Sequence, residues 1–170
     1  MKTKMMDLRE THTVPLQKVD KSDLVRSVFE DVPRYLGSRQ VDIRIRADTV
    51  KHLAVGLKWQ RLLDIGCGNG SISLPLLTPT SRFTLLDLSA GMLAAAQTNI
   101  PRELTSNVEI RNENFAMASF AEGAFDLIIP VGVLAHVDSP EEFILKITKI
   151  LRPGGALIIA FTDSHHITGR

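Results

Sequence analysis

The stretch Leu62 to Gly70 limits the possible fold more than any other part of the chain. An apolar run ends there in an acid and leads into a glycine-rich turn, LLDIGCGNG, with the spacing G-x-G-x-G. Glycine lacks a Cβ, so such a turn lets the backbone approach a ligand closely. A strand, a glycine turn and a following helix form the nucleotide-binding corner of a doubly wound α/β sheet. A tight turn that binds nothing is the alternative interpretation.

The composition favours a single soluble domain in a reducing compartment. Of the 170 residues 44% are hydrophobic, and 20 Lys and Arg face 19 Asp and Glu, so no net field favours nucleic acid or an anionic membrane. The one cysteine cannot form an internal disulfide. The polar N-terminus lacks the apolar stretch of a signal peptide, and no apolar run reaches membrane-spanning length. We therefore expect a cytoplasmic protein with neither a nucleic-acid nor a membrane partner.

The order of elements predicts an α/β fold with a doubly wound, mostly parallel sheet and N-terminal helices. Residues 1–20 are expected to form a flexible tail, and residues 21–57 a helical cap with a turn at 35–38 and a helix capped by Ser38. In the core, 58–162, apolar runs predict strands at 62–65, 82–87, 107–111, 125–131 and 156–161, and helices at 70–77, 89–100 and 139–152. Strands that alternate with helices in this way form a parallel sheet.

Two acids stand at neighbouring strand ends beside the glycine turn. Asp87 ends the second expected strand, where a carboxylate can accept both ribose hydroxyls of an adenosine bound over the turn. Asp64 precedes the glycines and is expected to face the same crevice, where it would meet a cationic group and would repel a pyrophosphate. The pair favours a ligand that carries positive charge, although a solvated acid at a strand end is the alternative for Asp87.

Four motifs, in this order, resemble those of the Rossmann-like (class I) S-adenosylmethionine-dependent methyltransferases. They are LLDIGCGNG at 62–70, LDLS at 86–89, FDLII at 125–129 and LRPGG at 151–155, within residues 58–162. The resemblance implies S-adenosylmethionine as cofactor and S-adenosylhomocysteine as product. It also implies that Asp87 holds the ribose hydroxyls and that Leu88 and Met92 flank the adenine. The other cofactor-binding residues, around the methionine and ribose, would be Asp64, Gly66, Cys67, Gly68, Asn69 and Gly70.

The chain departs from the family pattern at two positions of the expected cofactor site. Where many members carry an Asp that accepts from the adenine amino group, this chain has Asn114, whose side-chain oxygen can accept without a charge. Phe115 either covers the adenine face or packs in the core. Pro130 ends the fourth strand in place of a small polar residue, and its carbonyl remains available to the cofactor's ammonium group.

Methyl transfer from a sulfonium mainly requires alignment and exclusion of water, and a base only where the acceptor must lose a proton. His136 is the candidate base, and a structural loop histidine is the alternative. Tyr35 and Arg39 are candidates for a lid over the methionine end of the cofactor, and surface residues are the alternative. Arg39, Arg44 and Arg46 could form an anion site, but a solvated helix face is the preferred interpretation. The adjacent His165 and His166 lack the companion spacing of a metal site, so no metal is expected.

These observations predict a methyltransferase that acts on a small-molecule acceptor. A nicotinamide-dependent oxidoreductase is the first alternative, which the incomplete glycine fingerprint and Asp64 disfavour, and a non-catalytic cofactor-binding module is the second. The family's sheet normally continues past the fifth strand, so 163–170 would begin a missing C-terminal segment. A fragment of that kind is expected to bind cofactor but turn over poorly, and to self-associate through its exposed fifth strand.

Overall fold

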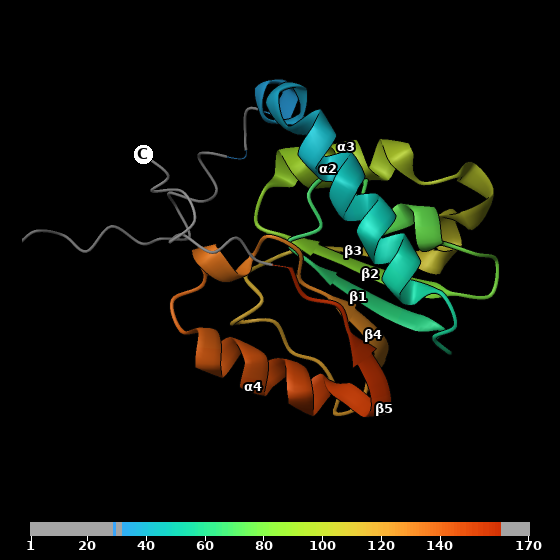
Figure 1. The fold of residues 1–170 in the computed structure, drawn as a ribbon, viewed down its shortest axis with the longest axis vertical. Helices are drawn as coiled ribbons and strands as arrows, with labels where there is room; N and C mark the ends of the chain where they lie inside the picture. Colours follow the sequence, from blue (N-terminus) through green and yellow to red (C-terminus); the bar gives the residue numbers. More distant parts are fainter. Residues whose placement is uncertain (1–28, 30–31, 161–170) are drawn as a thin grey trace, which may run out of the picture.

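Five parallel strands form one sheet in the order β3-β2-β1-β4-β5 (Figure 1). The computed structural model describes Phe29 and residues 32–160. The strands are β1 (Arg61–Ile65), β2 (Arg82–Asp87), β3 (Val108–Asn112), β4 (Phe125–Ile129) and β5 (Leu151–Leu157). The chain moves outward from β1 to β3 and then returns to place β4 on the other side of β1, so a topological switch point lies between β1 and β4. The predicted doubly wound α/β class is confirmed.

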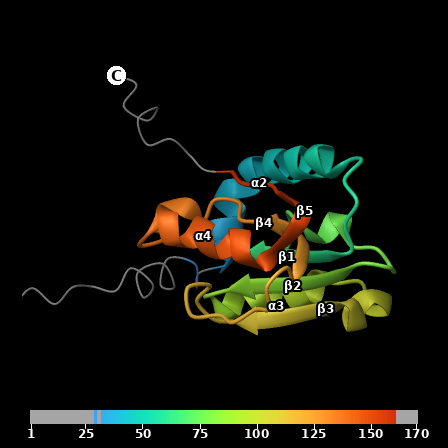
Figure 2. The same cartoon turned by 90° about the horizontal axis from the view of Figure 1, so that it is seen from below.

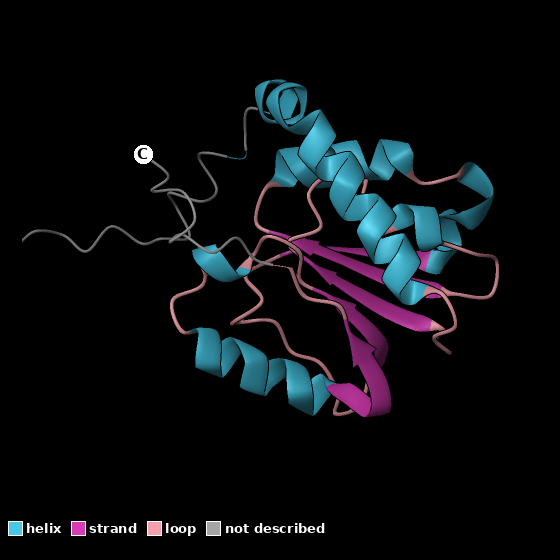
Figure 3. Cartoon of the chain, in the orientation of Figure 1, coloured by secondary structure: helices cyan, strands magenta, loops and turns pink. Residues whose placement is uncertain are grey.

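Helices cover both faces of the sheet. On one face α2 (Val32–Ala54) and α3 (Ala90–Asn99) pack against Leu62, and on the other α4 (Pro140–Ile150) packs against Leu63. Leu62 and Leu63 are neighbours in β1 and both are fully buried, because successive strand side chains point to opposite faces. In Figure 3 strands lie between α4 and α2, and Figure 2 shows the same molecule from below.

The N-terminal helix differs from the sequence prediction. The predicted turn at 35–38 is wrong, because α2 is continuous from Val32 and passes through Gly37. Pro33 lies in the first helical turn, where its missing N–H would have no partner in any case. Ser38 is therefore not an N-cap, and its Oγ donates to the Tyr35 carbonyl at 3.1 Å. The tail, and the helix expected before residue 31 apart from Phe29, lie outside the described residues.

The helix predicted at 70–77 is also wrong. A single 3-10 turn, Leu74–Leu76, follows the glycine turn. The Leu74 N–H donates to the Gly70 carbonyl at 2.9 Å, but the next residue is Pro75, which has no N–H with which to continue the helix.

The strand β5 begins earlier than predicted, at Leu151, directly after α4. Its register against β4 shifts between the pairs Phe125–Leu151 and Leu127–Ala156. Gly155 lies within this irregular stretch, and a Cβ there would stand 2.9 Å from the Asp126 carbonyl oxygen. The LRPGG segment, 151–155, thus forms the bulged start of β5, whereas the sequence predicted a helix to residue 152 and a strand only from residue 156.

The two other predicted helix starts are confirmed. Ser89 Oγ accepts from the Met92 N–H at 3.1 Å and caps α3, and Ser139 Oγ accepts from the Glu142 N–H at 3.3 Å and caps α4. Among the described residues no helix is both long and apolar enough to cross a membrane.

Asp126, the acid of the FDLII motif, connects β4 to the segment before β1 at the amino ends of the strands. Asp126 Oδ2 accepts from the backbone N–H groups of Gln60 and Arg61 at 2.9 and 2.8 Å, and Oδ1 pairs with Arg152 at 2.8 Å. Burial raises the pKa of Asp126, but these hydrogen bonds and charges outweigh it, so the pKa lies below its ordinary value. Asp126 therefore holds the approach to β1 at the edge opposite the glycine turn.

Candidate functional site

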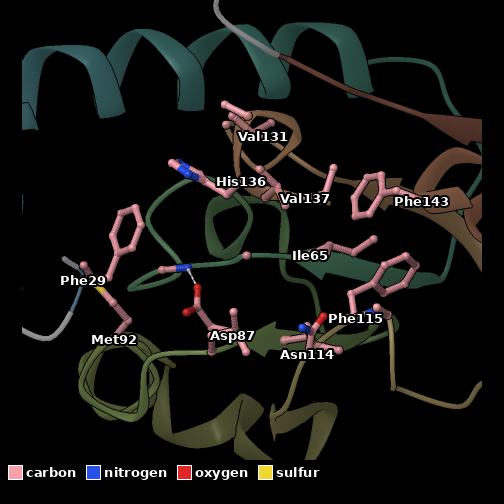
Figure 4. A pocket seen from close by; sticks show the side chains of 18 of the residues that line it. Phe29, Ile65, Asp87, Met92, Asn114, Phe115, Val131, His136, Val137 and Phe143 are labelled. Carbon is pink, nitrogen blue, oxygen red and sulfur yellow. Dashed lines mark hydrogen bonds between the residues drawn. The ribbon is translucent and has the colours of Figure 1, made fainter. Parts of the chain in front are cut away.

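A cavity of about 1030 Å³ opens at the carboxyl ends of the strands, beside the switch point (Figure 4). Asp87, Met92 and Phe29 lie toward one end of it, and Asn114, Phe115 and Phe143 toward the other. Eight of the residues predicted from the sequence line this cavity, namely Gly66, Gly68, Asp87, Leu88, Met92, Asn114, Phe115 and His136.

The glycine turn, residues 66–70, presents backbone to the cavity. Gly66 and Cys67 donate to the Leu86 carbonyl at 2.7 and 3.1 Å, which fixes the turn against β2. Gly66 has φ +68°, and a Cβ there would stand 2.5 Å from Val133 Cγ2. Gly68 has φ +53° with open space where its Cβ would be. Only glycine suits both positions, and a ligand can lie directly against the backbone.

Asp87 connects the glycine turn to the start of α3. Oδ2 accepts from the Gly68 N–H at 2.8 Å, the hydrogen bond drawn from Asp87 in Figure 4. Oδ1 accepts from the Ser89 N–H, also at 2.8 Å. Burial raises the pKa of Asp87, although these backbone N–H groups act in the opposite direction. A carboxylate has about four acceptor positions, so two remain for a ligand.

Asn112 is a supporting residue that the sequence reasoning missed. Its Nδ2 donates to the carbonyls of Asp87 and Leu88 at 3.0 Å each, which fixes the segment after β2. The residue ends β3, and its position after an apolar strand was the one available signal.

Asp64 is a buried carboxyl beneath the glycine turn. It is 2% exposed, and neither its Oδ2 nor the Ser73 Oγ makes a hydrogen bond of standard geometry. Burial raises the pKa of Asp64 to about 7, the nearby Ser73 hydroxyl opposes this, and the charge of Asp87 adds to it. A carboxyl of this kind ionises more readily beside a cation. Asp64 does not itself form part of the cavity wall.

The remaining predicted residues also lie away from the main cavity wall. Cys67 and Asn69 line a smaller recess between the glycine turn and α2. Pro130 is buried. Gly70 packs against Leu74, whose Cδ1 would stand 2.5 Å from a Cβ added at Gly70. After β4, the cavity is lined by Val131, Gly132 and Val133 instead of Pro130.

The loop after β3 forms the opposite end of the cavity. Asn114 Oδ1 accepts from the Ala116 N–H at 2.9 Å. Phe115 lines the cavity and is also 5% exposed, with its ring edge-to-face on Phe143 at 5.0 Å, so it belongs to the core as well.

Lys146 of α4 holds this loop and was missed by the sequence reasoning. Its Nζ donates to the carbonyls of Phe115, Ala116 and Ala118 at 2.6, 2.9 and 2.5 Å. Burial lowers the pKa of Lys146, although nearby Glu113 opposes that shift. In the sequence Lys146 reads as an ordinary basic residue in the second half of a helix, so no signal distinguished it.

Aromatic side chains and α2 surround the mouth of the cavity. The Phe29 ring lies edge-to-face on Tyr35 at 4.8 Å and on His136 at 5.8 Å. Ser89 Oγ donates to the Phe29 carbonyl at 3.2 Å, which anchors Phe29 to the start of α3. His136 is exposed and ends a 3-10 turn, Leu134–His136.

The basic residues of α2 divide between the cavity and solvent. Tyr35, Arg39 and Arg46 line the cavity, and Arg46 Nη1 lies 2.6 Å from the Cβ position of Gly132, which has φ +78°. Arg44 is exposed and lies outside the wall. The interpretation as a solvated face holds for Arg44, whereas Arg39 is exposed but also lines the cavity, and Arg46 is half-buried in the cavity wall. Arg39 and Arg46 share one face of α2 because they are seven residues, or about two helical turns, apart.

Within residues 32–160 and Phe29, no group of three or more His, Cys, Asp or Glu side chains is placed to hold a metal ion. His165 and His166, for which no metal site was predicted, lie outside the described residues.

A family model described as "Methyltransferase domain" matches residues 63–159, more than half of the chain. The chain belongs to this methyltransferase domain family. The match runs from the centre of β1 past the end of β5 and includes the glycine turn, Asp87 and Asn114. The recognition of the family from the sequence is confirmed.

Among curated relatives, this family member is similar to ubiquinone biosynthesis O-methyltransferases. The protein from Caulobacter sp. (strain K31) is 37% identical over 103 residues, which are 59% of this chain and 40% of the relative. The protein from Cronobacter sakazakii is 27% identical over 147 residues, which are 85% of this chain and 59% of the relative. The chain thus spans about half the length of these two relatives.

Solved structures show the same fold. The magnesium protoporphyrin IX methyltransferase of Synechocystis PCC 6803 with bound SAM aligns with a TM-score of 0.65 and 24% identity, over 88% of this chain and 79% of that one. The phosphoethanolamine N-methyltransferase 1 of Haemonchus contortus aligns with a TM-score of 0.72 and 19% identity, over 89% and 34%. At these identities the likeness establishes the fold.

Proposed function

We propose that this domain binds S-adenosylmethionine in the cavity and transfers its methyl group to a small-molecule acceptor. The observation that carries the proposal is the Asp87 carboxylate, which is held by the Gly68 and Ser89 N–H groups at the switch point, inside the region that matches the family. The names of the relatives, which include O-methyltransferases, support the reaction class. A cytoplasmic location stays a prediction.

The residues that line the cavity fit this cofactor. Asp87 has acceptor positions left for ribose hydroxyls, and the Asn114 oxygen and Phe115 ring lie at the other end, where an adenine would be held. Arg46 lies beside Gly132 at the end of β4 and would pair with the methionine carboxylate. The buried carboxyl of Asp64 suits a cationic ligand better than a pyrophosphate, which supports S-adenosylmethionine over a dinucleotide.

When bound, the cofactor supplies a methyl group already activated on a sulfonium. The chain's own residues then have to align the acceptor and exclude water. Val131 and Val133 give the cavity an apolar wall at the end of β4. His136, at the mouth, would accept a proton from an acceptor hydroxyl or amine, and Phe29 orients its ring.

The proposal is tested by the Asp87→Ala variant in calorimetry with S-adenosylhomocysteine. We expect binding to weaken by roughly 1.5–3 kcal/mol, the range for hydrogen bonds to a charged group. Asp48→Ala, which removes an exposed acid of α2, is the matched control and should bind like wild type. Urea unfolding of each variant separates a lost ligand contact from a loosened glycine turn. Unchanged affinity in a folded Asp87→Ala protein would remove Asp87 from the site.

A methyl-transfer assay tests the reaction itself. Label from S-adenosylmethionine should appear in an acceptor from a panel of phenols, carboxylic acids and amines, and His136→Gln should slow transfer to hydroxyl acceptors without changing affinity for S-adenosylhomocysteine. Affinity for the cofactor without transfer to any acceptor, in a protein extended to the full length of its gene, would favour the non-catalytic binding module.

A further inference from the structure

One face of α2 gives the cavity a cationic, hydroxyl-bearing wall. Tyr35, Arg39 and Arg46 follow the spacing i, i+4, i+11, which places them on a single helix face, and Ser38 joins them. The two arginines are separated by seven residues, or about 10 Å along the helix axis. No acid of α2 lines the main cavity, and Asp42 lines only the smaller recess. Arg34, in the first turn of α2, also lines the cavity, so the wall holds three cations.

The proposed cofactor requires only one of these cations. It carries a single carboxylate, and its ammonium and sulfonium groups are both positive. Arg46, beside Gly132 at the end of β4, is placed for that carboxylate. Arg39 is two turns away on the same face, and its ion pair with Asp42 has an N–O distance of 3.7 Å with side chains 53% and 57% exposed. A pair so long and so exposed contributes little, so Arg39 can exchange Asp42 for a ligand.

The cavity also has room and suitable surfaces for a second molecule on this side. Its volume of about 1030 Å³ is at the upper end of the range for single drug-sized ligands. In the close-up, α2 runs along the side that bears Val131 and His136, away from Asp87 and Asn114 (Figure 4). Tyr35, one helical turn before Arg39, lines the cavity together with Phe29 and His136, and the ring of Phe29 contacts the other two rings. Four acids outside α2 also line the cavity, namely Asp87, Glu113, Asp138 and Glu142. The one lysine of the lining, Lys146, already donates to backbone carbonyls of the loop after β3, so the arginines of α2 are the groups that favour an anion.

We propose that the acceptor carries an anionic oxygen group, a carboxylate or a phosphate, which Arg39 binds while the rest of the acceptor lies against the rings of Tyr35 and His136. This inference rests on the proposed function, because Arg39 is available to an acceptor only if Arg46 binds the carboxylate of the cofactor. It adds the chemical class of the acceptor, which family membership leaves open.

The test measures binding of three small probes to protein saturated with S-adenosylhomocysteine. Benzoate and phenyl phosphate carry an anion on the same ring, and benzamide is the neutral match for benzoate. We expect at least one anion to bind about tenfold more tightly than benzamide, as charge-assisted hydrogen bonds to a guanidinium do. Arg39→Gln should abolish that preference. Arg44→Gln, which removes the same charge from the solvent side of α2, should keep it.

Each outcome decides the proposal. A preference for benzoate alone identifies a carboxylate acceptor, and a preference for phenyl phosphate alone identifies a phosphate acceptor. Equal affinity for all three probes, or an anion preference that survives in Arg39→Gln, overturns the inference. Arg39→Gln protein that binds S-adenosylhomocysteine more weakly yet still prefers anions would make Arg39 a cofactor ligand, which also overturns it. Failure of S-adenosylhomocysteine to bind wild type contradicts the proposed function itself, and the inference with it.

Discussion

Three aspartates of the sheet show how position decides what a carboxylate does. Asp126, at the amino end of β4, accepts backbone N–H groups and pairs with arginine, which keeps it ionised. Asp87, at the carboxyl end of β2, holds the glycine turn and keeps acceptor positions for a ligand. Asp64 is buried beneath that turn, and its Oδ2 has no hydrogen-bond partner. Only the last two lie where a ligand can affect them.

Asp64 should make the stability of the ligand-free protein depend on pH. Its pKa is raised from 3.8 to about 7 by burial, so the folded state holds the proton more tightly than the unfolded chain. This contribution is complete below pH 3.8 and is lost as the pH rises to 7. The free energy of unfolding of Asp64→Asn should therefore rise relative to that of wild type by up to about 1.4 kcal/mol per pH unit across that window. Above pH 7 the difference should stay constant.

Urea unfolding of wild type and Asp64→Asn at half-unit steps of pH measures this difference directly. A constant difference in the free energy of unfolding between pH 4 and pH 7 would show that Asp64 is already ionised in the folded protein.

Asn114 should tolerate an acid but not an apolar side chain. Its Oδ1 accepts from the Ala116 N–H, and an oxygen can accept from an adenine amino group as well. Asn114→Asp keeps an acceptor in the same place and should keep affinity for S-adenosylhomocysteine. Asn114→Leu loses the acceptor and should weaken binding by about 1–3 kcal/mol. Equal calorimetric affinities for all three proteins would exclude Asn114 from adenine recognition.

At the scale of elements, the sequence predicted best where one local signal determined the structure. Asp87 ends β2 as predicted, and the hydroxyls of Ser89 and Ser139 cap α3 and α4. The failures occurred where one residue overrules a periodic pattern. Pro75 stops the helix after the glycine turn, and Pro33 lies in the first turn of α2, which then runs on through the turn predicted at 35–38. The bulge in β5 depends on close contact with β4, which no local pattern reveals.

Lys146 should couple α4 to the loop after β3. Lys146→Met keeps the aliphatic stem but leaves the carbonyls of Phe115, Ala116 and Ala118 without its ammonium group. We expect the free energy of unfolding to fall by about 1–3 kcal/mol and affinity for S-adenosylhomocysteine to fall with it, since the loop carries Asn114. Lys149→Met, on the exposed side of the same helix, should change neither. Equal affinities of both variants would mean that the loop holds its position without Lys146.

For the whole molecule, the sheet order brings segments far apart in the sequence to one edge. The glycine turn, Asp87, Asn114 and His136 were predicted from the sequence to meet there, and all of them line one cavity. Tyr35 and Arg39 were predicted as candidates for a lid, but Arg46 was not placed at the cavity, because the side of α2 that faces it depends on how the helix packs on the sheet. The strand β5 is at the edge of the described sheet, and self-association through it stays a prediction.

The central claim is that this cavity holds S-adenosylmethionine and not a dinucleotide. Titration of the ligand-free protein with S-adenosylhomocysteine and, separately, with NAD in a calorimeter tests it most directly. We predict that S-adenosylhomocysteine binds once per chain and that NAD does not bind, because the glycine turn has the spacing G-x-G-x-G and lacks the G-x-G-x-x-G of dinucleotide sites. Binding of NAD, or no heat and no shift in melting temperature with S-adenosylhomocysteine, would contradict the claim.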